Sequence, residues 1–410
     1  MATDVNVLII GGGVYGTSVA HHLATKGCRD VSLLEARTIG SQSSSQAAGF
    51  IRVHRVSDLS TQMALYSIEC FERFREETGH DIGARQVGGV LAALSEESDR
   101  RLRQWPDKAR RFGIESHLLT PAAAQARFPL MQTDGIRSVV YEPRDIYLES
   151  AEVPRGFARG ARAGGVEVRE HTPVRGIEIE GGRVVAVRTE RERLTARWVV
   201  LTGGAWGPRL AAQCGCRLAA VPVRHQLHIA APLPSVSPDF PMVRFPDLAI
   251  YVRPACGGLM VGGYEPNPAS YDPAEMNDAV DVTKLEPNRE ALRAATKAML
   301  PFFPVLDGAL IAREQQGLPT LSPDGLPIVG AVPGIEGLLV ASGDNVGGVS
   351  NSPAIGHIIS ELIVTGRSPF DLTLMAVDRF GLRYSDLPTL RQAAEASYVN
   401  FGRAYLGIST

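Results

Sequence analysis

Residues 5–35 read VNVLIIGGGVYGTSVAHHLATKGCRDVSLLE, and they carry the strongest fold signal in the sequence. Its first six residues are mostly apolar and rich in β-branched side chains, which predicts a strand buried on both faces of a parallel sheet. A Gly-x-Gly-x-x-Gly turn follows, and small and apolar residues at helical spacing then predict a helix that ends near Gly27. A second strand over 31–34 ends in Glu35. The stretch therefore predicts a β–α–β unit.

The three glycines of the turn have separate roles in such a unit. Gly11 permits the tight turn, Gly13 lets the backbone approach a pyrophosphate, and Gly16 lets the helix pack closely on the strand. The helix N-terminus then faces the phosphates, and Glu35 can accept hydrogen bonds from a ribose. A glycine-rich turn without a ligand has the same spacing, but the strand, helix, second strand and terminal acid together favour a dinucleotide site. The motif does not choose between NAD and FAD.

Composition limits the other functions. A chain of 410 residues is long enough for roughly two or three domains. Its net charge of −2 provides no field for a polyanion, which argues against nucleic acid as the main partner. No apolar run reaches the ~18 residues of a membrane span. The chain has five cysteines, and this odd number predicts reduced thiols and no metal site. The first strand begins almost at once, which argues against a signal peptide. We therefore expect a cytoplasmic protein.

Two later glycine-rich stretches favour FAD. An apolar strand over 198–201 is followed by Gly203, Gly204 and Trp206. Further on, PDGLP at 323–327 precedes another apolar strand, a glycine-rich turn and a helix. The N-terminus of that last helix is suited to the negative charge that a reduced flavin carries at N1 and C2=O.

In combination these segments resemble the D-amino-acid oxidase family of FAD enzymes, which includes glycine oxidase, sarcosine oxidases and dimethylglycine dehydrogenases. The resemblance extends from residue 5 to about residue 365. The matching segments are VLIIGGGVYG, LLEAR, GSQSSSQAAG, VVLTGGAW, IYVRPACGGLMVGG, LSPDGLPIVG and the last glycine-rich helix start. The resemblance implies oxidation of a C–N bond next to a carboxylate, with hydride transfer to flavin N5.

The expected fold is α/β, with a discontinuous Rossmann-like FAD-binding domain and an α+β substrate domain whose sheet covers the flavin. We assign residues 1–85, 145–222 and 311–375 to the FAD-binding domain. Residues 86–144 and 223–310 form the substrate domain, and 376–410 form a C-terminal tail.

The motifs and the resemblance together imply a cofactor site drawn from the first glycine turn, the second strand end, the 40–49 loop and the later glycine-rich turns. Its expected residues are Gly11, Gly13, Val14, Tyr15, Gly16, Glu35, Ala36, Arg37, Ser43, Ser44, Ser45, Gln46, Ala47, Ala48, Gly49, Val174, Gly203, Gly204, Trp206, Gly317, Asp344, Asn345, Gly347, Gly348, Val349 and Ser350. Relatives attach flavin through a His near position 46 or a Cys within 311–322, and this chain has neither, so we expect noncovalent FAD.

Four residues are candidates for the substrate side of the site. Arg52 matches the position where sarcosine oxidases hold the substrate carboxylate, and a guanidinium can grip a carboxylate in bidentate fashion, although a surface arginine fits the pattern too. Tyr251 matches an active-site tyrosine position, with an ordinary sheet aromatic as the alternative. His225 could accept or relay a proton, or serve as a structural histidine. Arg253 is the alternative carboxylate ligand.

The substrate class follows from one departure from the family. Glycine and D-amino-acid oxidases carry a carboxylate-binding arginine in a Gly-Leu-Arg-Pro segment, where this chain reads Gly-Leu-Pro-Thr at 317–320. This favours an N-substituted amino acid, such as a sarcosine-, dimethylglycine- or iminodiacetate-like compound, with oxygen or an electron carrier reoxidising the flavin. The alternatives are a 2-hydroxy acid or glycerol phosphate dehydrogenase, and a non-catalytic flavin-bearing subunit.

Overall fold

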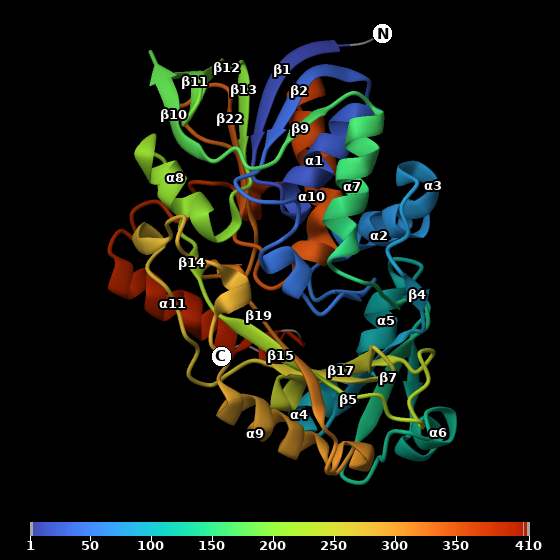
Figure 1. Ribbon diagram of the computed structural model, residues 1–410. Coiled ribbons are helices and arrows are strands. Elements are labelled where there is room, and N and C mark those ends of the chain that lie inside the picture. The colour runs from blue at the N-terminus through green and yellow to red at the C-terminus, as the bar shows by residue number, and fades with distance from the viewer. Residues whose placement is uncertain (1–2, 405, 408–410) are drawn as a thin grey trace.

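The computed structural model describes residues 3–404 and 406–407, and it confirms the α/β fold and the β–α–β unit (Figure 1). The unit consists of β1 (Thr3–Ile10), α1 (Val14–Thr25) and β2 (Cys28–Leu34), and the two strands pair in parallel. Side chains alternate along β1. Those of Val7 and Ile9 enter one hydrophobic core and those of Leu8 and Ile10 enter another, as expected of a strand buried on both faces.

This strand is central to a six-stranded sheet with the order β21-β22-β13-β1-β2-β9. One face is covered by α1, which packs against both α7 and α10, and the other by a three-stranded antiparallel sheet, β10-β11-β12. The remaining bounds are β9 (Glu167–Arg169), β13 (Trp198–Leu201), β21 (Ile328–Ala331), β22 (Leu338–Ser342), α7 (Glu152–Ala163), α10 (Gly348–Thr365), β10 (Val174–Glu180), β11 (Arg183–Thr189) and β12 (Arg193–Thr195).

The second domain is built on an eight-stranded mixed sheet with the order β19-β15-β18-β17-β16-β5-β7-β6, in the lower half of Figure 1. Helix α9 packs on β18 and β15, while α4 packs on β5 and β7. The bounds are β5 (Gly89–Ala93), β6 (His117–Leu119), β7 (Ser138–Glu142), β15 (His225–Ala230), β16 (Met242–Phe245), β17 (Ile250–Ala255), β18 (Gly258–Gly263), β19 (Ile311–Gly317), α4 (Glu96–Arg103), α5 (Trp105–Arg110), α6 (Pro121–Arg127) and α9 (Arg289–Met299).

Small sheets lie where the chain passes between the domains. Strand β8 pairs with both β3 and β4, and β14 pairs with β20. The bounds are β3 (Phe50–Ile51), β4 (Arg85–Gln86), β8 (Ile146–Tyr147), β14 (Val221–Pro222), β20 (Thr320–Leu321), α2 (Asp58–Glu72), α3 (Phe74–Thr78), α8 (Gly207–Gln213), α11 (Leu387–Val399) and α12 (Phe401–Ala404). Within the described residues, no helix has both the length and the apolarity to cross a membrane.

One boundary of the expected domain division differs from the structure. Residues 311–317 were assigned to the FAD-binding segments, but they form edge strand β19 of the eight-stranded sheet, antiparallel to β15. The C-terminal tail packs against the rest of the protein. Leu390, Ala394 and Tyr398 recur every fourth residue of α11 and form a buried apolar stripe that packs with Val221 and Leu321.

Candidate functional site

The glycine turn between β1 and α1 has the geometry that the motif predicts. Gly11 has a φ of +107°, and a Cβ there would lie 2.5 Å from the carbonyl oxygen of Thr202. A Cβ on Gly16 would lie 1.9 Å from the carbonyl oxygen of Gly11, so glycine at 16 lets the helix approach the turn, while glycine at 11 lets the turn approach Thr202. At the helix start, the Val14 N–H donates to the Ser44 hydroxyl at 3.1 Å.

Glu35 is held beside this turn by two backbone donors. Its carboxylate accepts from the Gly12 N–H at 2.6 Å and from the Arg37 N–H at 2.7 Å. Burial raises the pKa of Glu35, and the two hydrogen bonds oppose that rise. The carboxylate is therefore oriented at the end of β2, where a ribose would meet it.

A cavity of about 440 Å³ opens in front of this turn. Of the expected cofactor residues, those that line it are Gly11, Gly13, Glu35, Ala36, Arg37, Ser43, Ser44, Val174, Gly203, Gly204 and Trp206. Sequence reasoning missed other lining residues, among them Gln42, Pro173, Arg175, Thr202, Arg209, Met276 and Asp278. Met276 and Asp278 come from the other domain, which no motif could have indicated.

A short 3-10 helix, η1 (Ser43–Gln46), connects this cavity with a second one of about 440 Å³. Ser43 and Ser44 line the first cavity, whereas Ser45, Gln46 and the following Ala47 line the second. Residues of the eight-stranded sheet, including Arg253 and Gln315, line the second cavity from the opposite side. An extended ligand that lies along η1 would therefore reach from the glycine turn to the second domain.

The remaining expected cofactor residues line neither of these two cavities. Val14, Tyr15 and Gly16 form the first turn of α1, and Ala48 and Gly49 follow η1. Gly317 ends β19 beside η1, where a Cβ would lie 3.6 Å from the Cβ of Gln46. The others, at the start of α10, are Asp344, Asn345, Gly347, Gly348, Val349 and Ser350.

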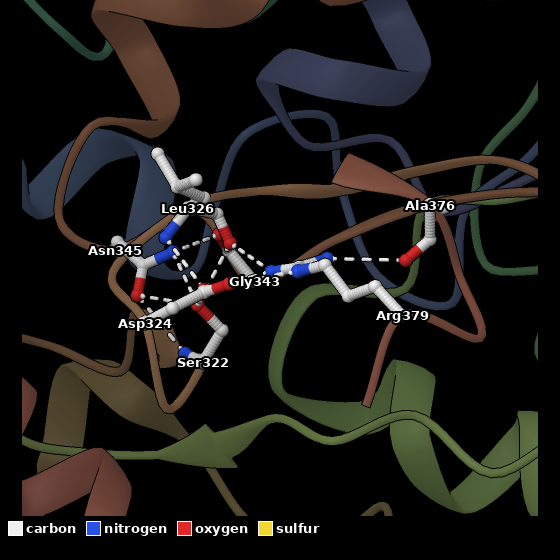
Figure 2. A network of polar contacts seen from close by, with 7 residues as sticks. All are labelled: Ser322, Asp324, Leu326, Gly343, Asn345, Ala376 and Arg379. Atoms are coloured by element: carbon white, nitrogen blue, oxygen red, sulfur yellow. Dashed lines mark hydrogen bonds and ion pairs between the residues drawn. The ribbon is translucent and has the colours of Figure 1, made fainter. Parts of the chain in front are cut away.

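The turn that leads into α10 has a strained backbone. Asn345 and Val346 have φ values of +47° and +63°, and a β-branched residue such as valine rarely adopts this left-handed conformation. Asn345 is fixed by Ser322, whose N–H donates to Oδ1 at 2.9 Å and whose hydroxyl accepts from Nδ2 at 3.1 Å (Figure 2). Burial raises the pKa of the neighbouring Asp344 to about 6.

Arg379 of the C-terminal tail holds the Pro-Asp-Gly segment in place, as Figure 2 shows. Its Nε and Nη2 donate to the two carboxylate oxygens of Asp324 at 2.8 and 2.9 Å, and Nη2 also donates to the Leu326 carbonyl at 2.8 Å. Asp324 in turn accepts from the Ser322 hydroxyl at 3.0 Å. The tail therefore supports the strained turn through Ser322.

His225, Tyr251 and Tyr398 form a buried hydrogen-bonded chain. The two ring nitrogens of His225 lie 2.8 Å from the Tyr251 hydroxyl (Nε2) and 2.9 Å from the Tyr398 hydroxyl (Nδ1). Burial, with a smaller effect of Arg244, lowers the pKa of His225 to about 3, so the imidazole is neutral and donates at one nitrogen while accepting at the other. Sequence reasoning found the first two residues but missed Tyr398, which lies 173 positions from His225.

Arg52 lies in a buried cluster with two carboxylates. Its Nε donates to Asp145 at 2.7 Å and its Nη2 to Glu142, and all three side chains are at most 2% exposed. The Glu142 carboxylate also accepts from the Trp105 indole at 2.9 Å. These contacts engage the guanidinium inside the protein, and the expectation that Arg52 grips a substrate carboxylate stays a prediction.

Arg253, the alternative anchor, is also buried but is held by neutral partners. Its Nε donates to the Ala48 carbonyl at 2.6 Å and its Nη1 to the Pro254 carbonyl at 2.7 Å. The guanidinium lies 4.8 Å from the ring centre of Tyr147, and the side chain lines the second cavity. The distance to the nearest carboxylate, that of the half-exposed Glu149, is 3.9 Å.

The sheet is parallel except for its edge strand β21, and it carries the glycine turn, the oriented acid and a cavity that continues toward a mixed sheet. These features define a two-domain, dinucleotide-dependent oxidoreductase. The chain belongs to the FAD-dependent oxidoreductase family, whose model, described as "FAD dependent oxidoreductase", matches residues 6–362. The residues present fit FAD, since the first cavity suits the adenosine and pyrophosphate half and η1 continues toward the second domain.

Individual proteins resemble this chain as well. It is 27% identical to human mitochondrial sarcosine dehydrogenase, over 99% of this chain and 44% of that protein. It is also 27% identical to the 4-methylaminobutanoate oxidase (formaldehyde-forming) of Paenarthrobacter nicotinovorans, over 93% of this chain and 46% of that one. The chain thus spans less than half of these relatives. The solved glycine oxidase from Geobacillus kaustophilus superimposes with a TM-score of 0.77 and 25% identity, over 91% of this chain and 98% of that one.

Proposed function

We propose that this protein oxidises the C–N bond of an N-substituted amino acid. The observation that carries the proposal is the position of η1 between the nucleotide cavity and a cavity lined by a buried arginine. The names of two similar proteins, sarcosine dehydrogenase and 4-methylaminobutanoate oxidase, denote action on N-methylated amino acids, which supports this substrate class.

Arg253 is the proposed anchor for the substrate carboxylate. Two backbone carbonyls orient its guanidinium through Nε and Nη1, which leaves Nη2 for a ligand in the second cavity. An arginine that is already oriented loses little conformational entropy on binding, so it places the reacting carbon precisely. FAD, when bound, accepts the hydride from that carbon.

His225 and Tyr251 are the proposed polar partners of the substrate amine. A substrate amine must lose its proton before its carbon can lose a hydride, so the amine reacts in its neutral form. With a pKa of about 3, the buried imidazole does not keep a proton from an ammonium group, and its proposed role is to orient the Tyr251 hydroxyl, with the Tyr398 hydroxyl on its other ring nitrogen.

A panel of substrates read by flavin bleaching in the absence of oxygen tests the proposal. Sarcosine, iminodiacetate, proline-like imino acids and 2-hydroxyglutarate separate the candidate reactions. We expect bleaching with one or more of the amines. Bleaching by the hydroxy acid alone would make the protein a 2-hydroxy acid dehydrogenase, and no bleaching at all would indicate a flavin-bearing subunit without catalysis.

We also propose that FAD is dissociable and that oxygen or an electron carrier reoxidises it. Gln46 and Gly317 lie beside each other where some relatives carry the residues that bond flavin covalently. Acid precipitation should therefore leave yellow cofactor in the supernatant, and colour in the pellet would refute this. The free state of all five cysteines supports the proposed cytoplasmic location.

A further inference from the structure

We propose that residues 276–282, here called the strap, close the FAD cavity and hold the cofactor in place. The strap belongs to the 264–288 connection between β18 and α9, whose helical parts are two 3-10 turns. It leaves the eight-stranded sheet and crosses to the nucleotide-binding domain. Its Met276 and Asp278 line the first cavity, although every motif that predicts this cavity lies in the other domain.

The strap is held mainly through its backbone. The Asn277 carbonyl accepts from the indole N–H of Trp206 at 3.0 Å. The Met276 carbonyl accepts from Nη1 of Arg209, also at 3.0 Å. Both donor side chains line the cavity that the strap covers. The same side chains thus form part of the cofactor site and fasten the strap over it.

Arg37 makes the most contacts with the strap. Its Nη2 donates to the carbonyls of Asp278 at 2.8 Å and Val280 at 2.9 Å, and its Nη1 lies 3.9 Å from the Asp281 carboxylate. Arg37 lies two residues after Glu35, which follows the end of β2. Its contacts therefore fasten the strap beside the expected ribose position.

Two further side chains of the nucleotide-binding domain hold the strap. The Gln42 side chain accepts from the Val282 N–H at 2.9 Å and donates to Asp281 at 3.4 Å, and Arg175 pairs with Asp278. At the first end of the strap, Met276 is buried with Ala205 and Leu318.

Polar contacts at a partly exposed surface fasten the middle of the strap, while Met276 and Val282 at its two ends are buried in a small apolar cluster. Arg37 is 35% exposed and the Asp278 carboxylate is 62% exposed. The polar contacts exchange readily with water, so the middle of the strap can open and close again while its buried ends stay packed. Release of the adenosine half then requires the strap to open, and bound FAD keeps it closed.

The release rate of FAD from the holoenzyme tests this role. The double variant Asn277→Ala and Asp281→Ala loosens the strap without altering a residue that lines the cavity. Asn277→Ala removes the side-chain oxygen that accepts from the Ala279 N–H at 2.9 Å. Asp281→Ala removes the carboxylate that accepts from the Thr283 N–H and from the Gln42 side-chain amide. The matched control is Asp272→Ala, which removes a similar local bond, to the Ala274 N–H at 2.8 Å, in the same connection but outside the strap.

Free FAD fluoresces more strongly than bound FAD, so its appearance after dilution of the holoenzyme gives the rate. We expect the double variant to release FAD at least tenfold faster than the wild type and the control to stay within twofold. Equal rates in all three proteins would overturn the proposal.

Limited proteolysis of the wild type provides a second readout that needs no variant. Holoenzyme and flavin-stripped protein are digested in parallel, and cuts within 264–288 are followed by mass spectrometry. We expect these cuts to appear at least several-fold faster without FAD. Cleavage of this connection at the same rate in both forms would show that the cofactor does not hold the strap, and would overturn the proposal.

Discussion

Arg52 brings one positive charge to two carboxylates that water does not reach. Burial raises the pKa of Asp145 to about 6 despite the opposing charge of Arg52. For Glu142 the charge of Arg52 and the hydrogen bonds from Arg52 and His54 outweigh burial, and its pKa is lowered. The cluster is therefore electrostatically balanced only while the arginine is present.

Removal of that arginine should damage the fold more than the chemistry. Because Arg52→Met leaves buried carboxylates without a cation, we expect a loss of about 3–5 kcal/mol in the free energy of unfolding. Urea denaturation of both proteins measures it. A variant with wild-type stability but a weakened affinity for carboxylate substrates would return Arg52 to the role of substrate anchor.

Two buried histidines make stability depend on pH. Burial lowers the pKa of both His22 and His225 to about 3, from an ordinary value of 6.5. Below about pH 6.5 these histidines bind protons in the unfolded chain but stay neutral in the folded chain. The free energy of unfolding therefore falls as the pH falls, by up to about 1.4 kcal/mol per pH unit for each histidine.

The substitution His225→Gln separates one of these contributions while it keeps a polar side chain between the two tyrosines. We expect the wild type to lose stability more steeply than the variant between about pH 6 and pH 4, with a slope that differs by about one proton. Urea denaturation at several pH values gives the slopes. Parallel curves would show that His225 does not titrate on unfolding.

Among the elements, the turn before α10 depends on the C-terminal tail. Arg379 grips Asp324 with two nitrogens, and that grip holds Ser322 against the strained Asn345. A hydrogen bond to a charged group contributes about 1.5–3 kcal/mol. Loss of this support should therefore affect both stability and the start of α10.

We expect Arg379→Met to lower the free energy of unfolding by about 2 kcal/mol and to weaken FAD binding. Arg383→Met is the matched control, because Arg383 is exposed in the same tail and lies over the ring of Tyr384 at 5.2 Å. Thermal unfolding and FAD titration of the two variants measure both effects. If they behave alike, the tail does not support the turn.

Local elements could be predicted from the sequence because their determinants are neighbours in the chain. The β1–α1–β2 unit, the glycine turn and Glu35 lie within one continuous stretch, and all of them form as expected. The edge strand β19 could not be assigned in the same way. Its membership depends on pairing with β15, more than eighty residues earlier, and a boundary drawn from composition carries no information about that partner.

At the scale of the whole molecule, the contacts that complete the site come from distant segments. The partners of Arg52 lie about ninety residues away, Tyr398 reaches His225 from the tail, and the strap crosses from the other domain. These contacts follow from the tertiary arrangement and have no local pattern. Family resemblance indicated the cofactor and the class of reaction, but it could not indicate that Arg52 is paired with two buried carboxylates.

The proposed function requires that Arg253 hold the substrate carboxylate while the amine faces the flavin. Stopped-flow reduction of the flavin without oxygen tests it, with an N-methyl amino acid and the matching amine that lacks the carboxylate. Arg253→Lys keeps the charge but loses the planar fork, so we expect kcat/KM for the amino acid to fall at least about tenfold with FAD content unchanged. The amine should be a poor substrate for both proteins. Equal reduction of the wild type by amino acid and amine, or an unchanged rate in Arg253→Lys, would contradict the account.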